Sequence, residues 1–510
     1  MSATCNPSTS PHSPSDAEII EQLKQKLQNA ETMIQFLREQ LRLQRIAKYG
    51  PGSEKLTSQQ LELLEFEPGV SNLEVAAEGE REELPSSSPK KRKHPGRQTL
   101  PAGLPRVERV IACTAEQCMC GGCGAETTVI GYEESEQLDV EPVKYFVLVT
   151  KREKRACKSC EERGVVAAPL AARIIEKSLV SDRVIIDTVV SKYADHAPLY
   201  RQSVILRRDA GIDIGRATLD GWVMRVGEVL IPLVEVMRRE LLSGSYIQAD
   251  ETPVDVQTRD GRARNHQAYL WQYGSPGKSV IFEFRMGRGR EGPLRFLGNF
   301  EGILQTDAYA AYDRVGGPNM VHAACWAHAR RWYIEATKLN KQDLASTQIV
   351  AQMAKLFAID AQASDGVMNH AQRHALRTER APSVLRDLRV QIEAASTTAL
   401  PASPLGKGCS YTLRLWDKLT RFLDYPELEL SNNLAENSMR PVATGRRNWT
   451  HIGHEKAGPR VAAILSIVET CRRLKIPVRE YLATVLPGLA NTSIQRLSEL
   501  TPSAWATRNL

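Results

Sequence analysis

Two strand-like runs that each lead into an aspartate constrain the fold of this chain more than any other feature. Residues 245–249 lead into Asp250, and residues 302–306 lead into Asp307. Short runs of this kind, bounded by Gly and Ser, are typical of strands in a buried sheet. The sequence predicts strands near 245–257, 267–274, 278–285, 302–306 and 319–324. Together with the helices between and after them, these strands predict an α/β fold.

A third acidic residue, Glu436, lies at the start of a predicted helix. Asn432 and Asn433 can cap that helix, because Asn side chains accept hydrogen bonds from the first backbone N–H groups. Two strand carboxylates and one helical carboxylate can converge on a pair of Mg²⁺ ions, or Mn²⁺, which clamp the attacking and leaving oxygens of a phosphodiester. We therefore interpret Asp250, Asp307 and Glu436 as candidate catalytic residues and metal ligands.

The chain carries 60 Asp and Glu residues, so an acidic trio alone says little, and Glu427 or Glu429 could replace Glu436. The sequence around these acidic residues is more specific. It reads Ala-Asp-Glu-Thr-Pro-Val at 249–254, Leu-Gln-Thr-Asp-Ala-Tyr-Ala-Ala-Tyr at 304–312, Cys-Trp-Ala-His-Ala-Arg-Arg at 325–331 and Asn-Asn-Leu-Ala-Glu-Asn at 432–437. In this order the blocks closely resemble transposases of the insertion sequence 66 family, from about residue 18 to about residue 490.

The resemblance implies an RNase H-like catalytic domain with an Asp-Asp-Glu triad. Such an enzyme would cleave DNA at the ends of an insertion sequence and join it to target DNA, so both DNAs are expected partners. Two alternatives stay open, a DNA-end-binding protein or repressor that no longer cleaves, and an RNase H-like nuclease without strand joining. The family usually has Arg directly after the catalytic Glu, where this chain has Asn437. Whether this difference impairs activity is open.

Two Cys-x-x-Cys pairs separated by strand-like sequence predict a zinc-binding ribbon over residues 107–175. The cysteines are Cys120, Cys123, Cys157 and Cys160. Four thiolates make a tetrahedral Zn²⁺ site, and because the protein fills every position the zinc would be structural. Cys113 or Cys118 could substitute for one ligand, and four unrelated structural cysteines are the alternative. The family resemblance agrees with a zinc module before the catalytic domain.

The N-terminal third is predicted to hold a helix and a linker. After an expected disordered stretch at 1–15, a coiled-coil helix is predicted at 16–67. Residues 18–48 within it carry apolar side chains at coiled-coil spacing, which favours a homo-oligomer. The same stripe could instead pack against the protein's own body. Residues 68–106 lack any apolar period and are interpreted as a linker, acidic and then basic. Its candidate DNA contacts are Lys91, Arg92, Lys93 and Arg97.

Residues 176–240 are predicted to be helical, with a turn at Gly211. A helix, a glycine turn and a second helix resemble a helix-turn-helix, which would place Arg216 and Thr218 near the start of a recognition helix. Ordinary helical packing explains the pattern equally well.

The predicted catalytic domain comprises residues 241–334 and 429–457, interrupted by a helical insertion at 335–428 and followed by a helical region at 458–510. Basic residues near the acidic trio could neutralise DNA phosphates. They are Arg330, Arg331, Arg440, Arg446 and Arg447. The spacing of His322, Cys325 and His328 invites a second metal site, but a strand-to-helix context puts them on mixed faces. A packed structural or DNA-facing role is therefore favoured.

Composition limits the setting of the protein. At 510 residues the chain should form roughly two to four domains, and its net charge of +7 suits a polyanionic partner. No apolar run approaches the length of a membrane span, and the paired cysteines suggest a reducing compartment. We expect a cytoplasmic, nucleoid-associated protein with no membrane partner, which could act with accessory proteins of the same element.

Overall fold

The computed structural model describes residues 171–258, 265–340, 343–365 and 367–509, the segments 145–150, 154–156 and 165–167, and the helical positions Lys24, Leu27, Ala30 and Ile34. The helices and strands named below belong to one compact unit, which leaves out Pro85–Val147. Leu27 and Ile34, two apolar positions of the predicted coiled coil, are exposed. The coiled coil itself stays a prediction.

Several predictions fall outside the described residues. They concern the stretch at 1–15, most of the helix at 16–67, the linker at 68–106 with Lys91, Arg92, Lys93 and Arg97, and the zinc cysteines Cys120, Cys123, Cys157 and Cys160. Within the predicted ribbon, the short strands β1 (Lys154–Ala156) and β2 (Val165–Ala167) form an antiparallel pair.

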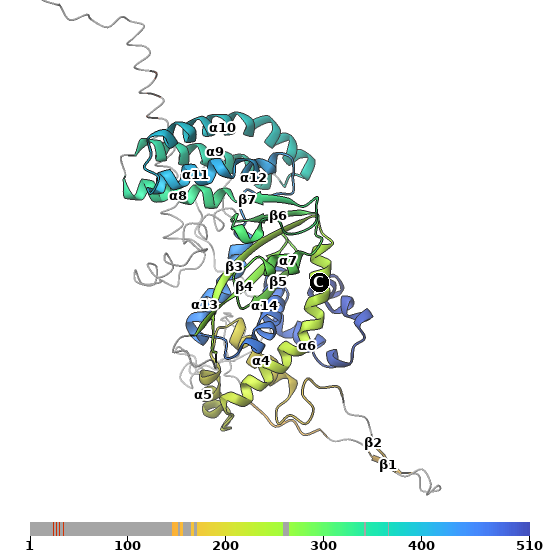
Figure 1. The fold of residues 1–510 in the computed structure, drawn as a ribbon. Helices are drawn as coiled ribbons and strands as arrows, with labels where there is room; N and C mark the ends of the chain where they lie inside the picture. Colours follow the sequence, from red (N-terminus) through yellow and green to blue (C-terminus); the bar gives the residue numbers. More distant parts are fainter. Residues whose placement is uncertain are drawn as a thin grey trace, which may run out of the picture. The chain divides into compact units, whose positions relative to one another are not determined.

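A five-stranded sheet forms the centre of the fold (Figure 1). Its strands are β3 (Tyr246–Val256), β4 (His266–Gly274), β5 (Val280–Arg285), β6 (Ile303–Thr306) and β7 (Val321–Ala324). They lie in the order β5-β4-β3-β6-β7, with antiparallel pairing from β3 to β5 and parallel pairing from β3 through β6 to β7. All lie where the sequence predicts strands. A helix, α7 (Glu291–Leu297), separates β5 from β6, but a single 3₁₀ turn, η2 (Ala310–Tyr312), is the only helical element between β6 and β7.

Helices pack against the antiparallel strands of the sheet. Helix α14 (Gly458–Arg473) packs on β5 and on the long helix α6 (Arg216–Leu242), while α13 (Asn433–Trp449) packs on β3 and β4. The hydroxyls of Ser466 and Thr470 accept hydrogen bonds from the backbone N–H groups of Phe282, at 2.8 Å, and Val280, at 3.0 Å. Because α14 satisfies these groups, the edge strand offers little template for pairing with another chain.

A second group of helices lies between β7 and α13. Its members are α8 (Trp326–Leu339), α9 (Leu344–Asp365), α10 (His370–Thr398), α11 (Pro404–Arg414) and α12 (Trp416–Thr420). They pack on one another (Figure 1) around a second hydrophobic core, which also includes buried residues of β3, β6 and β7. These helices occupy most of the predicted insertion at 335–428, although α8 begins before it, inside the predicted catalytic segment.

The region before the sheet contains α4 (Asp182–Tyr193), α5 (Leu199–Ala210) and α6. Gly211 ends α5 in the left-handed conformation, at φ 69°, which glycine adopts without steric strain. Leu206 of α5 and Leu219 of α6 are buried. The predicted helix, glycine turn and helix therefore form at the expected places.

The C-terminal elements are mostly helical, as the sequence predicts. They are α15 (Val478–Val485), α16 (Pro502–Asn509) and the 3₁₀ helices η4 (Glu455–Ala457), η5 (Leu489–Asn491) and η6 (Ile494–Leu500); η3 (Arg421–Leu423) lies earlier, after α12. Among the helices that the structure describes, none is both long and apolar enough to cross a membrane.

The close contact between α6 and α14 depends on Gly227. A Cβ atom there would lie 2.7 Å from the Cβ atom and the backbone oxygen of Arg460. We expect Gly227→Ala to lower the free energy of unfolding by about 1–3 kcal/mol, because two helix backbones must move apart. Urea unfolding followed by circular dichroism measures this. Gly221→Ala, on the same helix but with nothing within 4 Å of the added atom, is the control. It should leave stability unchanged or raise it by up to about 1 kcal/mol, and an equal loss in both variants would contradict the packing argument.

Candidate active site beside the carboxyl end of β6

The parallel register of β3 and β6 brings the two predicted catalytic aspartates side by side. Gln248 pairs with Gln305, and each aspartate follows its glutamine by two residues. Asp307 is half-buried directly after β6, whereas Asp250 is 7% exposed and lies within β3 rather than at its end. The two carboxylates therefore approach each other at the point where β6 stops and β3 continues.

Hydrogen bonds orient both carboxylates. Asp250 Oδ1 accepts from the backbone N–H of Glu251 at 2.9 Å, and Asp307 Oδ1 accepts from that of Tyr309 at 2.8 Å. The backbone oxygen of Asp307 accepts from the Tyr411 hydroxyl at 2.6 Å, which fixes the turn to α11.

The charge balance shows how closely these groups interact. Burial raises the pKa of Asp250 well above its usual value, and the negative charges of Glu251 and Asp307 raise it further, while Arg331 acts in the opposite direction. A carboxylate whose pKa is raised by neighbouring negative charges is stabilised by a cation placed beside it. Oxygen donors in a shared negative field are also the ligands that Mg²⁺ and Mn²⁺ prefer.

Glu436 lies in the first turn of α13, but its carboxylate has other neighbours. It is 4% exposed, and its Oε1 lies 3.3 Å from His328 Nε2 while its Oε2 lies 4.0 Å from an Arg331 nitrogen. Arg331 thus connects Glu436 electrostatically with Asp250. Among the described residues, no three His, Cys, Asp or Glu side chains gather closely enough to hold a metal ion. The aspartates fit a metal by donor type and charge, and Glu436 is near them without completing a ligand set.

The start of α13 is held by a strand residue that sequence reasoning missed. Asn432 is the N-cap residue, but its side chain makes no capping hydrogen bond, and Asn433 is already the first helical residue. Asn432 therefore takes the predicted cap position, but the predicted side-chain hydrogen bond is absent, and Asn433 lies inside the helix. Instead, Gln248 Oε1 accepts from the backbone N–H of Ala435 at 3.3 Å, and its Nε2 donates to the backbone oxygen of Ser431 at 3.0 Å.

Gln248 belongs to a buried polar network. The Tyr246 hydroxyl donates to Gln305 Oε1 at 2.5 Å, and Gln305 Nε2 donates to the backbone oxygen of Glu429 at 2.7 Å. The repeated pattern of Gln two residues before Asp, at 248 and at 305, was the available sequence signal. These glutamines are positioning residues, because they set the segment that carries Glu436 against the strands that carry the aspartates.

Neighbouring acids have partners of their own. Glu251 Oε1 accepts from Arg288 at 2.7 Å and Oε2 from the Tyr312 hydroxyl at 2.8 Å. Burial and then Asp307 raise the pKa of Glu251. Glu429 forms an ion pair with Arg373 at 3.0 Å, in the helical bundle, which makes it a poor substitute for Glu436. Arg288 was also missed by sequence reasoning.

The residues His322, Cys325 and His328 are held in three separate environments. The Lys418 ammonium donates to His322 Nδ1 at 3.0 Å, and His322 Nε2 lies 2.9 Å from the Thr306 hydroxyl. The buried Cys325 sulfur accepts from the backbone N–H of Asn432 at 3.5 Å. With His328 beside Glu436, these side chains pack around the site instead of sharing one metal.

The candidate DNA contacts differ in exposure. Arg216, Thr218 and Arg447 are exposed, and Arg331 and Arg440 are partly buried. Arg330 is buried and lies over the Phe357 ring, 5.6 Å from its centroid, so it does not suit the predicted phosphate contact. Arg446 donates to the backbone oxygen of Pro253, a structural role that ties α13 to β3.

Comparison with known protein families places the chain in a class. Residues 177–460 match the sequence family described as Transposase IS66 family, and residues 117–161, which include all four predicted zinc ligands, match the zinc-finger binding domain of transposase IS66. Residues 36–109 match a family described as Transposase C of IS166 homeodomain. These matches define a protein of the transposase class. More narrowly, the chain belongs to the IS66 transposase family, which confirms the resemblance inferred from the sequence.

The chain is also similar to curated proteins of Sinorhizobium fredii, each named as an uncharacterized protein. It is 30% identical to y4jD over 95% of this chain and 97% of that protein. It is 28% identical to y4hP, over 93% of this chain and 88% of the relative. A third relative, y4qI, is 30% identical over 84% of this chain and 79% of its own length.

His322 should make the free energy of unfolding depend on pH in the acidic range. Burial, followed by the nearby Lys418 charge, lowers its pKa to about 4. The unfolded chain therefore binds a proton that the folded chain resists, so stability is full above pH 6.5 and falls as the pH drops toward 4. At pH 5 the loss from this residue is about 2 kcal/mol. We expect His322→Gln, which keeps one donor and one acceptor, to lose less stability than the parent between pH 7 and pH 5 in denaturant titrations. Equal losses in both proteins would show that His322 is not the sensitive group.

Proposed function

We propose that this protein is a DNA transposase whose RNase H-like domain cuts DNA at insertion-sequence ends and joins the cut end to target DNA. The observation that supports this most is the parallel register that sets Asp250 and Asp307 side by side, with Glu436 entering from α13. The strand order, three antiparallel strands followed by two parallel ones, supports an RNase H-like sheet. Membership of the IS66 transposase family supports DNA as the substrate.

In this proposal, Asp250, Asp307 and Glu436 would hold two Mg²⁺ or Mn²⁺ ions, whose positive charge would stabilise the attacking and leaving oxygens. The residues around them bind and orient. Arg331 lies close to Glu436 and lowers the pKa of Asp250, so its charge partly balances the carboxylates, and it would contact a DNA phosphate. His328 holds the Glu436 carboxylate by its Nε2 atom.

The proposal divides the chain between binding and chemistry. Exposed Arg216 and Thr218 at the start of α6 support DNA binding by the α5–α6 pair, and the bundle at 335–428 would grip the ends of the element. Exposed Leu27 and Ile34 favour self-association through the N-terminal helix. We place the protein in the cytoplasm, on the nucleoid, with accessory proteins of the same element as candidate partners.

Two other functions are carried as alternatives. A repressor or end-binding protein would keep the helical and zinc modules but not cleave, and Asn437, half-buried beside Glu436, is the residue that motivates it. An RNase H-like nuclease would cleave without joining.

Removing one aspartate tests the chemistry. With DNA carrying the ends of the element and Mg²⁺, we expect Asp307→Asn to reduce cleavage and strand transfer by roughly 100-fold or more, because several kcal/mol of charge stabilisation are lost. Binding to the same DNA in a gel-shift assay should stay within a few-fold of the parent.

Asp313→Asn is the matched control, since this acid lies in the same loop but pairs with Lys418 at 2.7 Å. Its activity should resemble that of the parent. Chelation by EDTA should abolish cleavage by both proteins until Mg²⁺ or Mn²⁺ is added back. Strand transfer by Asp307→Asn at the parent's rate would rule out this assignment. If the parent cleaves DNA without joining it, the nuclease function is favoured. If the parent binds DNA without cleaving it, the repressor function is favoured.

The zinc site is tested on the full chain. We expect about one equivalent of Zn²⁺ per chain by elemental analysis, held by Cys120, Cys123, Cys157 and Cys160. The double variant Cys157→Ser and Cys160→Ser should retain less than about half an equivalent, because two thiolates are lost. Cys5→Ser, outside both motifs, should keep the parent's content. Unchanged zinc in the double variant would contradict this ligand set.

A further inference from the structure

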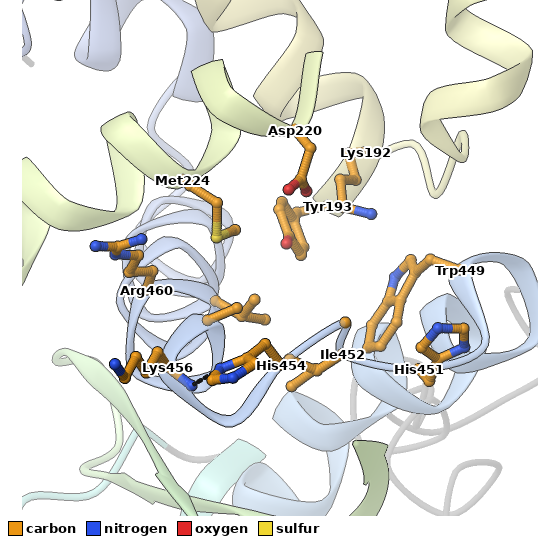
Figure 2. Close-up of a pocket in the computed structure, with 13 residues that line it drawn as sticks. Lys192, Tyr193, Asp220, Met224, Trp449, His451, Ile452, His454, Lys456 and Arg460 are labelled. Carbon is orange, nitrogen blue, oxygen red and sulfur yellow. Dashed lines mark hydrogen bonds between the residues drawn. The ribbon is translucent and has the colours of Figure 1, made fainter. Parts of the chain in front are cut away.

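A cavity of about 370 Å³ lies away from the carboxylates, between α4, α6 and the segment that joins α13 to α14 (Figure 2). Its lining includes Lys192, Tyr193, Trp449, His454, Lys456 and Arg460. None of these residues takes part in the chemistry proposed above. A volume of this size suits a small ligand, such as one nucleotide.

Two aromatic rings form one side of the cavity. The ring centroids of Tyr193 and Trp449 are 6.4 Å apart, at an interplanar angle of 59°. A Cβ atom at Gly445 would lie 2.4 Å from the Trp449 indole nitrogen, so the indole rests against its own helix at a position that only glycine leaves open. Figure 2 shows Trp449 across the cavity from Lys456 and Arg460. Such a ring is a platform on which a planar base can stack.

Cations outnumber anions around the cavity. The lining contains Lys192, Lys456 and Arg460 and two histidines, against a single acid, Asp220. Lys456 is exposed and has no ion-pair partner in the part of the chain that the structure describes, and Arg460 reaches Glu228 only at 3.9 Å. This imbalance favours an anionic ligand.

Lys192 adds a cation on the aromatic side. Its Nζ atom lies 5.4 Å from the Tyr193 centroid and 5.8 Å from that of Trp449. Burial lowers the pKa of Lys192 to about 8, against the opposing effect of Asp220. An anion in the cavity would stabilise this ammonium.

The cavity is tied to the strand that carries Asp250. The backbone N–H of Ile452 donates to the Asp255 oxygen at 2.8 Å, and that of Gln257 donates to the Ile452 oxygen at 2.9 Å. Val256, which bridges Ile452, lies six residues after Asp250, a separation of roughly 20 Å at the rise of an extended strand. DNA that reaches the carboxylates can therefore reach the cavity.

Backbone strain marks the same segment. Thr450, between Trp449 and the cavity's histidines, has φ 58°, a left-handed conformation that is unfavourable for a β-branched residue. Such outliers persist where surrounding contacts enforce them, and they concentrate at ligand-binding sites. Here the strained turn directs the chain from the end of α13 to the bridge with β3.

We propose that this cavity binds one unpaired DNA nucleotide, with its base on Trp449 and its phosphate between Lys456 and Arg460. In a duplex both faces of a base are covered by its neighbours, so a base can reach Trp449 only if it leaves the stack. Identifying the ligand as a DNA nucleotide rests on the proposed function. The step involves no covalent change.

The test uses the full chain in EDTA with a thymidine oligonucleotide that carries one 2-aminopurine, single-stranded or fully paired. We expect the parent to quench 2-aminopurine in the single strand more than in the duplex, because the fluorescent base stacks on the indole. Trp449→Leu should lose the quenching and weaken single-strand binding by about tenfold, whereas Trp449→Phe should retain most of both. Equal quenching in single strand and duplex would overturn the proposal.

Trp416→Leu is the matched control. Trp416 is also half-buried and also lies near a cation, with the Arg389 guanidinium 5.4 Å from its ring centroid, but it belongs to α12. It should behave like the parent. Equal effects of the two Trp→Leu changes would overturn the proposal.

A surface variant provides a second test in case Trp449→Leu does not fold. Lys456→Glu should weaken single-strand binding by about tenfold and flatten its salt dependence, because a phosphate contact is lost. Lys475→Glu, an equal charge change on an exposed residue beyond α14, should have a much smaller effect. Equal losses in the two variants would overturn the proposal.

Asp307→Asn separates this inference from the catalytic one. Its quenching in EDTA should match the parent's, since no metal ligand lies in the cavity. If the parent binds no DNA, the proposed function and the cavity's ligand both fail. If the parent binds and cleaves DNA but Trp449→Leu and Lys456→Glu leave affinity and quenching unchanged, the cavity proposal alone fails.

Discussion

The parallel pairing of β3 with β6, closed by the buried amides of Gln248 and Gln305, is the constraint on which the rest of the site depends. A buried amide must find hydrogen-bond partners, since leaving it unsatisfied costs about 1–3 kcal/mol. Gln248 finds them at Ser431 and Ala435, 183 and 187 residues away in the chain. The hydrogen bonds that satisfy the Gln248 amide therefore also fix where α13 starts and where Glu436, in its first turn, lies.

A buried ion-pair cluster in the helical bundle also helps to set the start of α13. Arg377, 1% exposed, donates to Asp360 and to the backbone oxygens of Phe422 and Leu428, at 3.1 and 2.9 Å. Buried ion pairs of this kind add little net stability, because desolvation offsets their attraction, but breaking one is strongly unfavourable. We infer that the cluster acts to specify the path of the chain into α13. An insertion remote in sequence thus helps to place Glu436.

Electrostatics links this architecture to function. After burial, the charges of Glu251 and Asp307 raise the pKa of Asp250, and the charge of Asp307 raises the pKa of Glu251. Arg331 in α8 opposes the shift at Asp250, and Arg288 in the loop before α7 opposes the shift at Glu251. Buried carboxylates with raised pKa values are stabilised by nearby positive charge. The aromatic, basic cavity is connected to the same strand, because the backbone of Ile452 hydrogen-bonds with Asp255 and Gln257.

The sequence by itself determined the five strands, the helix pair around Gly211, the helical run at 335–428 and the transposase family, because apolar period, turn residues and local motifs act over short distances. It also singled out Asp250 and Asp307. It could not determine that Gln248 rather than Asn432 caps α13, that Arg330 is buried, or that His328 and Arg331 contact Glu436. Those facts, and the cavity lined from α4, α6 and the segment after α13, depend on contacts between residues far apart in the chain. Only the tertiary structure decides such contacts, because packing sets each side chain's neighbours, charge and exposure.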